Sequence, residues 1–257
     1  YSLVIGLALA LLIGSGAFAY YRNSPSKKVR LSFAIAVVVM MIAIAWTGIY
    51  YAVFSLILIC AAVLWRIAKR ANVRSLAWEF SPVIGIGFLC IIGFLPAVLT
   101  LRGDAPLAPL GERTPFESVI FAGNLAIALL PLPQSVLPGM SHYNTTVTNA
   151  FSAAPPLENN VITNHGTWVT AAALLAFLIA LLMRSRRSAS MATAQPFNLP
   201  ASSRPLHAPR VSLGLIGYLL IVALLFFIPW GLNFFFAEFI TPQIRAWNRL
   251  EPALLLL

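Results

Sequence analysis

The segment Leu31–Trp65, LSFAIAVVVMMIAIAWTGIYYAVFSLILICAAVLW, runs for 35 residues without one charged side chain. An α-helix rises about 1.5 Å per residue, whereas the hydrocarbon core of a bilayer is about 30 Å thick. The segment is therefore too long for one perpendicular crossing. We expect a tight outer turn at Thr47-Gly48, because the residues around it are aromatic and favour the membrane interface: Trp46, Tyr50 and Tyr51. The alternative is one long tilted helix, which would invert the orientation of every later span.

The whole chain has the same apolar character. Hydrophobic residues make up 60% of it, charged residues 9%, and the mean hydropathy is +0.88, which lies far outside the range of soluble domains. Main-chain polar groups in lipid must bond to one another, which only helices and closed barrels achieve. The apolar runs are continuous rather than alternating, which excludes a barrel. The predicted fold class is an all-α integral membrane protein.

We expect about six transmembrane helices and the start of a seventh. Residues 1–101 hold four of them, 102–166 form an extracytoplasmic loop, and 167–257 hold the fifth, the sixth and the start of the seventh, with a cytoplasmic linker at 188–209. The spans are Ser2–Tyr20, the two halves of Leu31–Trp65, Ser81–Thr100, Thr167–Met183, Val211–Phe236 and a beginning at Leu254–Leu257. Ser2–Tyr20 lacks the basic start of a signal peptide and is interpreted as a span. We expect Pro96 and Pro229 to kink their helices. Both chain ends lie in apolar runs, so a fragment of a longer protein is expected.

The basic residues set the orientation of these spans. Of 17 Lys and Arg, 13 fall in the connectors 22–30, 66–74 and 184–210, which the positive-inside rule assigns to the cytoplasm. The net charge of +10 is therefore a topology signal, and we expect the bilayer rather than a nucleic acid as the partner. Glu79 is expected to be an interfacial charge paired with nearby basic residues; a role in proton transport is the alternative.

The loop Arg102–Gly166 is too polar and too rich in proline to cross a membrane. Thr114-Pro115-Phe116-Glu117 has the form of a capping box with proline at the first helical position. It predicts a short amphipathic helix that ends before Pro131 and lies on the membrane surface or on the bundle. The chain has no His or Cys cluster with metal-ligand spacing, and no metal site is predicted from it.

The outer turn and the loop carry motifs of one known family. Gly48–Phe54, GIYYAVF, resembles the G-x-Y-Y-A-x-F signature of large bacterial multi-spanning membrane proteins of the YfhO type, which are grouped with the GT-C glycosyltransferases. Arg113 and Glu117, followed by LLPLP at Leu129–Pro133, resemble the loop that comes next in those proteins. Gln134-Ser135 stands where that family often has a His-Arg pair.

Two later elements continue the resemblance in the same order. Asn164–Trp168, NHGTW, stands where the family has a small aromatic turn into the next span. Ile244–Leu250, IRAWNRL, looks like an element before a later span. The resemblance covers the chain from about Leu31 to its end.

The resemblance implies transfer of a sugar from a polyprenyl-phosphate donor, on the outer face of a bacterial inner membrane, to a glycan or lipid acceptor. The catalytic acid of such enzymes lies in the first outer loop, and since no acid precedes Glu79 here, it is expected upstream of Tyr1. A divalent metal could also hold the departing phosphate. The expected substrate-binding residues are Arg245, Trp247, Asn248, Arg249, Glu117, Arg113, Tyr50, Tyr51 and His165.

Each assignment has an alternative. Arg245 and Arg249 are four residues apart, which would put them on one face of a helix, where they could bind a phosphate bidentately; they could equally be interfacial anchors beside Trp247. Glu117 is explained by its capping role alone. A non-enzymatic lipid-glycan translocase or assembly protein on the same scaffold is the second functional hypothesis.

Overall fold

The computed structural model describes residues 2–69, 71, 73–100, 113–123, 139, 142, 145–146, 211–244 and 246–257. All regular structure in these ranges is helical, as predicted. Three helices there are long and apolar enough to cross a membrane, Lys27–Trp46, Ile49–Ala68 and Ser75–Pro96, and a bent pair could form a fourth span. Such helices are typical of a membrane protein. The predicted span Thr167–Met183 and the linker 188–209 lie outside the described residues.

The predicted hairpin within Leu31–Trp65 is confirmed. Helix α3 (Lys27–Trp46) and helix α4 (Ile49–Ala68) are separated by Thr47-Gly48. Gly48 has φ of 141°, a conformation that side-chain-bearing residues rarely adopt. Both helices extend beyond the uncharged segment, so each reaches 20 residues. The single long tilted helix is therefore wrong.

The first predicted span is not one helix. Helix α1 (Ser2–Gly14) ends at Ser15-Gly16, and a second helix, α2 (Ala17–Arg22), follows. Gly16 has φ of 82°, the left-handed region in which an α-helix cannot continue. The 13 residues of α1 reach about 20 Å, which is shorter than the hydrocarbon core. The helix predicted over Ser2–Tyr20 is therefore interrupted at Ser15-Gly16.

The span predicted at Val211–Phe236 is also interrupted. Helix α12 (Leu213–Phe227) and helix α13 (Leu232–Phe239) meet at an angle of 63°. Pro229 has no N–H, and it forces its predecessor out of the helical region; Ile228 accordingly has ψ of 149°. Proline thus breaks this helix instead of kinking it. Pro96, by contrast, lies inside helix α6 (Ser81–Thr100), which continues past it.

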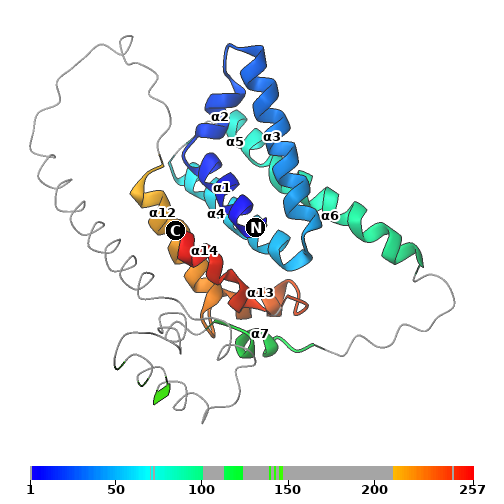
Figure 1. The fold of residues 1–257 in the computed structure, drawn as a ribbon, viewed down its shortest axis with the longest axis vertical. Helices are drawn as coiled ribbons and strands as arrows, with labels where there is room; N and C mark the ends of the chain where they lie inside the picture. The colour runs from blue at the N-terminus through cyan, green and yellow to red at the C-terminus, as the bar shows by residue number, and fades with distance from the viewer. Residues whose placement is uncertain are drawn as a thin grey trace, which may run out of the picture.

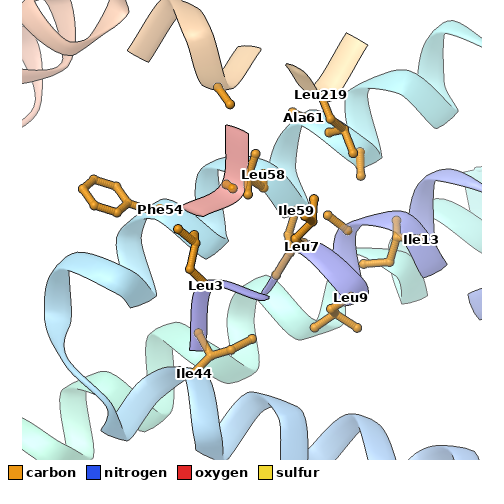
Figure 2. Packing of buried hydrophobic residues seen from close by; sticks show 14 of the residues in the cluster. Leu3, Leu7, Leu9, Ile13, Ile44, Phe54, Leu58, Ile59, Ala61 and Leu219 are labelled. Carbon is orange, nitrogen blue, oxygen red and sulfur yellow. The ribbon is translucent and has the colours of Figure 1, made fainter. Parts of the chain in front are cut away.

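The core of the bundle is built around α1. Its buried leucines and isoleucines meet side chains of α3, α4 and α12 (Figure 2). Gly6 allows α1 and α4 to approach closely, because a Cβ at this position would collide with the side chain of Ser55. Small residues at helix crossings are a general means of packing membrane helices.

The described helices place the connectors at two ends of the bundle, seen in Figure 1. We call one the basic end: it contains α2, the start of α3 and helix α5 (Val73–Glu79). We call the other the loop end: it contains the α3–α4 turn, helix α7 (Glu117–Ile120), α13 and the 3-10 helix η2 (Trp247–Leu250). The last helix, α14 (Glu251–Leu256), packs on α1 and α12.

The predicted loop helix needs correction. Helix α7 begins at Glu117 rather than Pro115, its N-cap residue Phe116 makes no side-chain cap bond, and it ends at Ile120 instead of continuing towards Pro131. The predicted continuation after Gly123 lies outside the described residues. The predicted pairing of Glu79 with a basic residue is confirmed: Arg66 Nη2 lies 3.2 Å from its carboxylate, which is buried within the protein.

Candidate functional site

Three segments far apart in sequence meet at the loop end around one main-chain carbonyl. The Gln243 carbonyl oxygen accepts a hydrogen bond from Arg113 Nη1 at 3.1 Å and from the Tyr50 hydroxyl at 3.4 Å. Tyr50 lies in the first turn of α4, and Arg113 stands four residues before α7. The carbonyl therefore joins the hairpin, the loop and the segment after α13.

A second guanidinium completes this cluster. The Arg249 guanidinium carbon lies 5.2 Å from the centre of the Tyr50 ring, within the range of a cation–π interaction. Arg249 belongs to η2, and its side chain is exposed. Within the part of the chain that the structure describes, neither Arg113 nor Arg249 forms an ion pair. We call Tyr50, Arg113, Gln243 and Arg249 the guanidinium cluster.

Trp247 forms the support beneath the cluster. It is fully buried, with ring centres of Phe54, Phe226 and Phe236 at 5.3, 5.4 and 5.3 Å. Its indole Nε1 is buried and has no hydrogen-bond partner among the described residues. Trp247 was expected among the substrate-binding residues, but no part of its side chain is exposed. Four packed aromatic rings fix η2 instead, and this holds Arg249 in place beside Tyr50.

Polar contacts attach α7 to the broken helix pair. Asn233 Nδ2 on α13 donates to the Ser118 carbonyl at 3.2 Å. The Gly123 N–H donates to the carbonyl of Phe227, the last residue of α12, at 2.7 Å. A side chain at Gly123 would collide with the Phe227 ring. These contacts position the segment that carries Arg113.

An apolar groove lies at the loop end, at the α3–α4 turn. It has a volume of about 580 Å³ and runs between the α3–α4 turn and α6, with Ile49, the neighbour of Tyr50, in its wall. The other lining residues are Ala45, Trp46, Gly48, Cys90, Gly93 and Phe94. The volume lies within the usual range for ligand sites, and an apolar chain is the kind of ligand that this lining suits.

The predicted site residues separate into three groups. Tyr50, Arg113 and Arg249 are brought together, with Trp247 below them. Tyr51 is half-buried and packs against the core, and Glu117 is the first residue of α7. Arg245, His165 and the side chain of Asn248 lie outside the described residues. Ile244 and Ala246 are not helical, and Arg249 lies in the 3-10 helix η2; the expected placement of Arg245 on the same face lies outside the described residues.

Two contributors were missed by the sequence analysis. Gln243 acts through its carbonyl, and every residue has one, so no residue type marks it. Asn233 did carry a signal, because it is the only amide in the predicted spans, and a buried amide in a membrane helix usually has a polar partner.

The cluster has the chemistry of an anion site. Guanidinium groups are permanently charged and offer paired donors to phosphate. Among the described residues no three His, Cys, Asp or Glu side chains are grouped so as to hold a metal ion. No known protein family, curated protein or solved structure matches this chain. The function is therefore inferred from the guanidinium cluster and the groove at the loop end.

Proposed function

We propose that the chain is part of a polytopic membrane glycosyltransferase of the GT-C type, which transfers a sugar from a polyprenyl-phosphate donor at the loop end. The observation that carries the proposal is the convergence of Arg113 and Arg249 on Tyr50 and the Gln243 carbonyl. Tyr50, Arg113 and Arg249 come from three segments that carry the family resemblance.

A lipid-linked donor matches the two halves of this region. Its phosphate is anionic and sits at the membrane surface, where Arg113 and Arg249 offer charge-assisted donors. Its prenyl chain is long and apolar, and a groove lined by Trp46, Ile49 and Phe94 includes the residue before Tyr50. A water-soluble sugar nucleotide has no apolar chain that would occupy such a groove.

The proposal includes the full predicted topology. Six spans and the start of a seventh would place the loop end outside a bacterial plasma membrane and the basic end in the cytoplasm. The alternation of the described helices supports this arrangement, because Tyr50, Arg113 and Gln243 belong to three connectors that were all predicted on one side. Arg22 and Arg66, from two connectors predicted on the other side, both contact α5.

The chemistry divides between groups of opposite charge. An acceptor hydroxyl would attack the anomeric carbon of the donor sugar, the bond from that carbon to the phosphate oxygen would break, and a carboxylate base would take the hydroxyl proton. Negative charge grows on the departing phosphate, and the guanidinium groups of Arg113 and Arg249 would stabilise it. In the family that the chain resembles this base is an acid of the first outer loop, and no acidic residue precedes Glu79 in this sequence.

Conservative substitutions in the full-length protein test this proposal. Arg249→Lys and Arg113→Lys keep the charge but lose the planar pair of donors, so we expect sugar transfer from a labelled polyprenyl-phosphate donor to fall more than tenfold at equal expression. Arg22→Lys is the matched control, because the Arg22 guanidinium lies 5.1 Å over the Trp78 ring at the opposite end. Equal transfer by the wild type and both loop-end variants would overturn the proposal.

One observation favours the non-enzymatic alternative, a lipid-glycan translocase or assembly protein. Arg113 and Tyr50 both donate to a main-chain carbonyl and not to a carboxylate. Such a site could hold a phosphate without performing chemistry. Donor binding that depends on Arg249, combined with no transfer in the complete protein, would identify this alternative.

A further inference from the structure

A second groove lies at the basic end, between α1, α2 and α3, with a volume of about 460 Å³. Its α3 wall follows one row of residues four apart, Lys28, Ser32, Ala36 and Met40, which lie one above another on a helix face. Ser32 and Ala36 are small, and the hollow exists because their side chains leave it unfilled. From Lys28 to Met40 the wall is about 18 Å long at 1.5 Å per residue.

The opposite wall is made of aromatic and aliphatic side chains. Tyr21 of α2 and Leu12 of α1 line it. The Tyr21 ring stacks on Phe33 with centres 5.5 Å apart, and the rings of Phe18 and Phe33 meet edge to face at 5.3 Å. These contacts hold the wall in one position, so the groove is preformed.

Polarity changes along the groove. Lys28, Ser32 and the Tyr21 hydroxyl provide polar groups towards one end, whereas Leu12, Val37 and Met40 are wholly apolar. A ligand that fits must therefore have a polar head and an apolar tail. A free inorganic anion would leave the apolar part of the groove empty.

The charge at the polar end is positive and uncompensated. Lys28 lies in a run with Arg22, Lys27 and Arg30. Among the described residues of this end the only acid is Glu79, which is buried and already bonded to Arg66 and Ser75. A lysine with a long aliphatic stem at a membrane surface can place its ammonium group at the level of lipid phosphates.

We propose that this groove binds one anionic phospholipid of the surrounding bilayer. Lys28 pairs with its phosphate, the hydroxyl groups of Tyr21 and Ser32 donate hydrogen bonds to the head group, and one acyl chain lies along Ala36, Val37 and Met40. The inference uses only the basic end and does not depend on the function proposed for the loop end.

Charge-matched variants of the full-length protein provide the first test. The measurement is the affinity for phosphatidylglycerol in detergent solution, followed by native mass spectrometry, with phosphatidylcholine as the neutral comparison. A basic residue near a membrane surface contributes enough to change affinity about fivefold, so Lys28→Gln is expected to weaken binding by that factor. Lys27→Gln removes the same charge one residue away and outside the groove, and it should change binding less than twofold.

Filling the groove provides the second test. Ala36→Leu should weaken phosphatidylglycerol binding at least fivefold with the charge untouched, whereas Ala34→Leu, on the exposed surface of α3 outside the groove, should not. Inorganic phosphate should not compete. Equal effects of the two lysine variants, no effect of Ala36→Leu, competition by free phosphate, or equal binding of phosphatidylcholine would each overturn the proposal.

Discussion

Arg66 and Glu79 form a two-point ion pair that ties the end of α4 to the end of α5. Arg66 Nη2 lies 3.2 Å from Glu79 Oε1, and Arg66 Nε donates to Oε2 at 3.3 Å. The Ser75 hydroxyl donates to the same carboxylate at 2.9 Å. The carboxylate is fully buried, and its oxygens are satisfied from two elements. This pair, together with the Ser75 hydroxyl, explains how a buried acid is accommodated among apolar helices.

Glu79→Gln should destabilise the protein. Removing one partner of a buried pair leaves the other charge uncompensated, at a typical cost of about 3–5 kcal/mol. We expect a clear fall in the temperature at which the detergent-solubilised protein loses its monodisperse elution peak. Glu238→Gln is the control, because Glu238 is exposed on α13, and exposed substitutions usually change stability by less than about 0.5 kcal/mol. Identical melting of both variants would contradict the structural role.

Asn233→Leu should release α7 from the bundle. The substitution keeps the approximate volume of the side chain but leaves the Ser118 carbonyl without its 3.2 Å donor, which costs about 1–3 kcal/mol for a buried group. Amide hydrogen exchange of residues 113–123 should accelerate. Gln243→Ala should leave exchange unchanged, since the contacts of Gln243 with Arg113 and Tyr50 use its main-chain carbonyl. Unaltered exchange in Asn233→Leu would show that this hydrogen bond does not hold α7 on the bundle.

Two glycines should respond to alanine with opposite signs. A Cβ at Gly6 collides with Ser55, whereas a Cβ at Gly87 meets nothing within 4 Å. Gly6→Ala should therefore destabilise the α1–α4 contact by about 1–3 kcal/mol, the usual cost of overpacking. Gly87→Ala should stabilise α6 by about 0.5–1 kcal/mol through the loss of backbone freedom in the unfolded chain. The unfolding temperatures of the two variants are compared in the same detergent. A shift in the same direction for both variants would contradict the prediction.

The two ends of the bundle should be accessible from opposite sides of the membrane. In a background with Cys60→Ala and Cys90→Ala, Gln243→Cys should react with an impermeant maleimide in intact cells, and Asn23→Cys should react only after permeabilisation. The positive-inside rule supplies the direction. Labelling of both positions from one side would contradict the arrangement of α3, α4 and α12.

The hairpin was predictable because length decided it. Thirty-five uncharged residues exceed one crossing, and Gly48 marks where they divide. The interruption of the first span was harder to predict, since Ser15-Gly16 is common inside membrane helices and only the positive φ of Gly16 stops the helix. A kink was predicted at Pro229, whereas the helix breaks there. The size of the effect depends on whether neighbouring groups satisfy the carbonyls that proline frees, which a single sequence does not show.

The site was predicted through its residue types more than through its geometry. Tyr50, Arg113 and Arg249 were expected in one region, and they meet there. Trp247 was misplaced because tryptophan is common at membrane interfaces, whereas here Phe54, Phe226 and Phe236 form a core position for it. Those three phenylalanines come from α4, α12 and α13, so no local pattern connects them.

The hydrogen bond from the Gly123 N–H to the Phe227 carbonyl, 2.7 Å long, makes a connector residue the cap of a membrane helix. The carbonyl at this helix end would otherwise need another donor in a setting where water is scarce. Coupling between two equilibria is reciprocal. A ligand that restricts the motion of Arg113, ten residues before Gly123, would thus also stabilise the end of α12. Conversely, a change in the angle between α12 and α13 would change the affinity of Arg113 for that ligand.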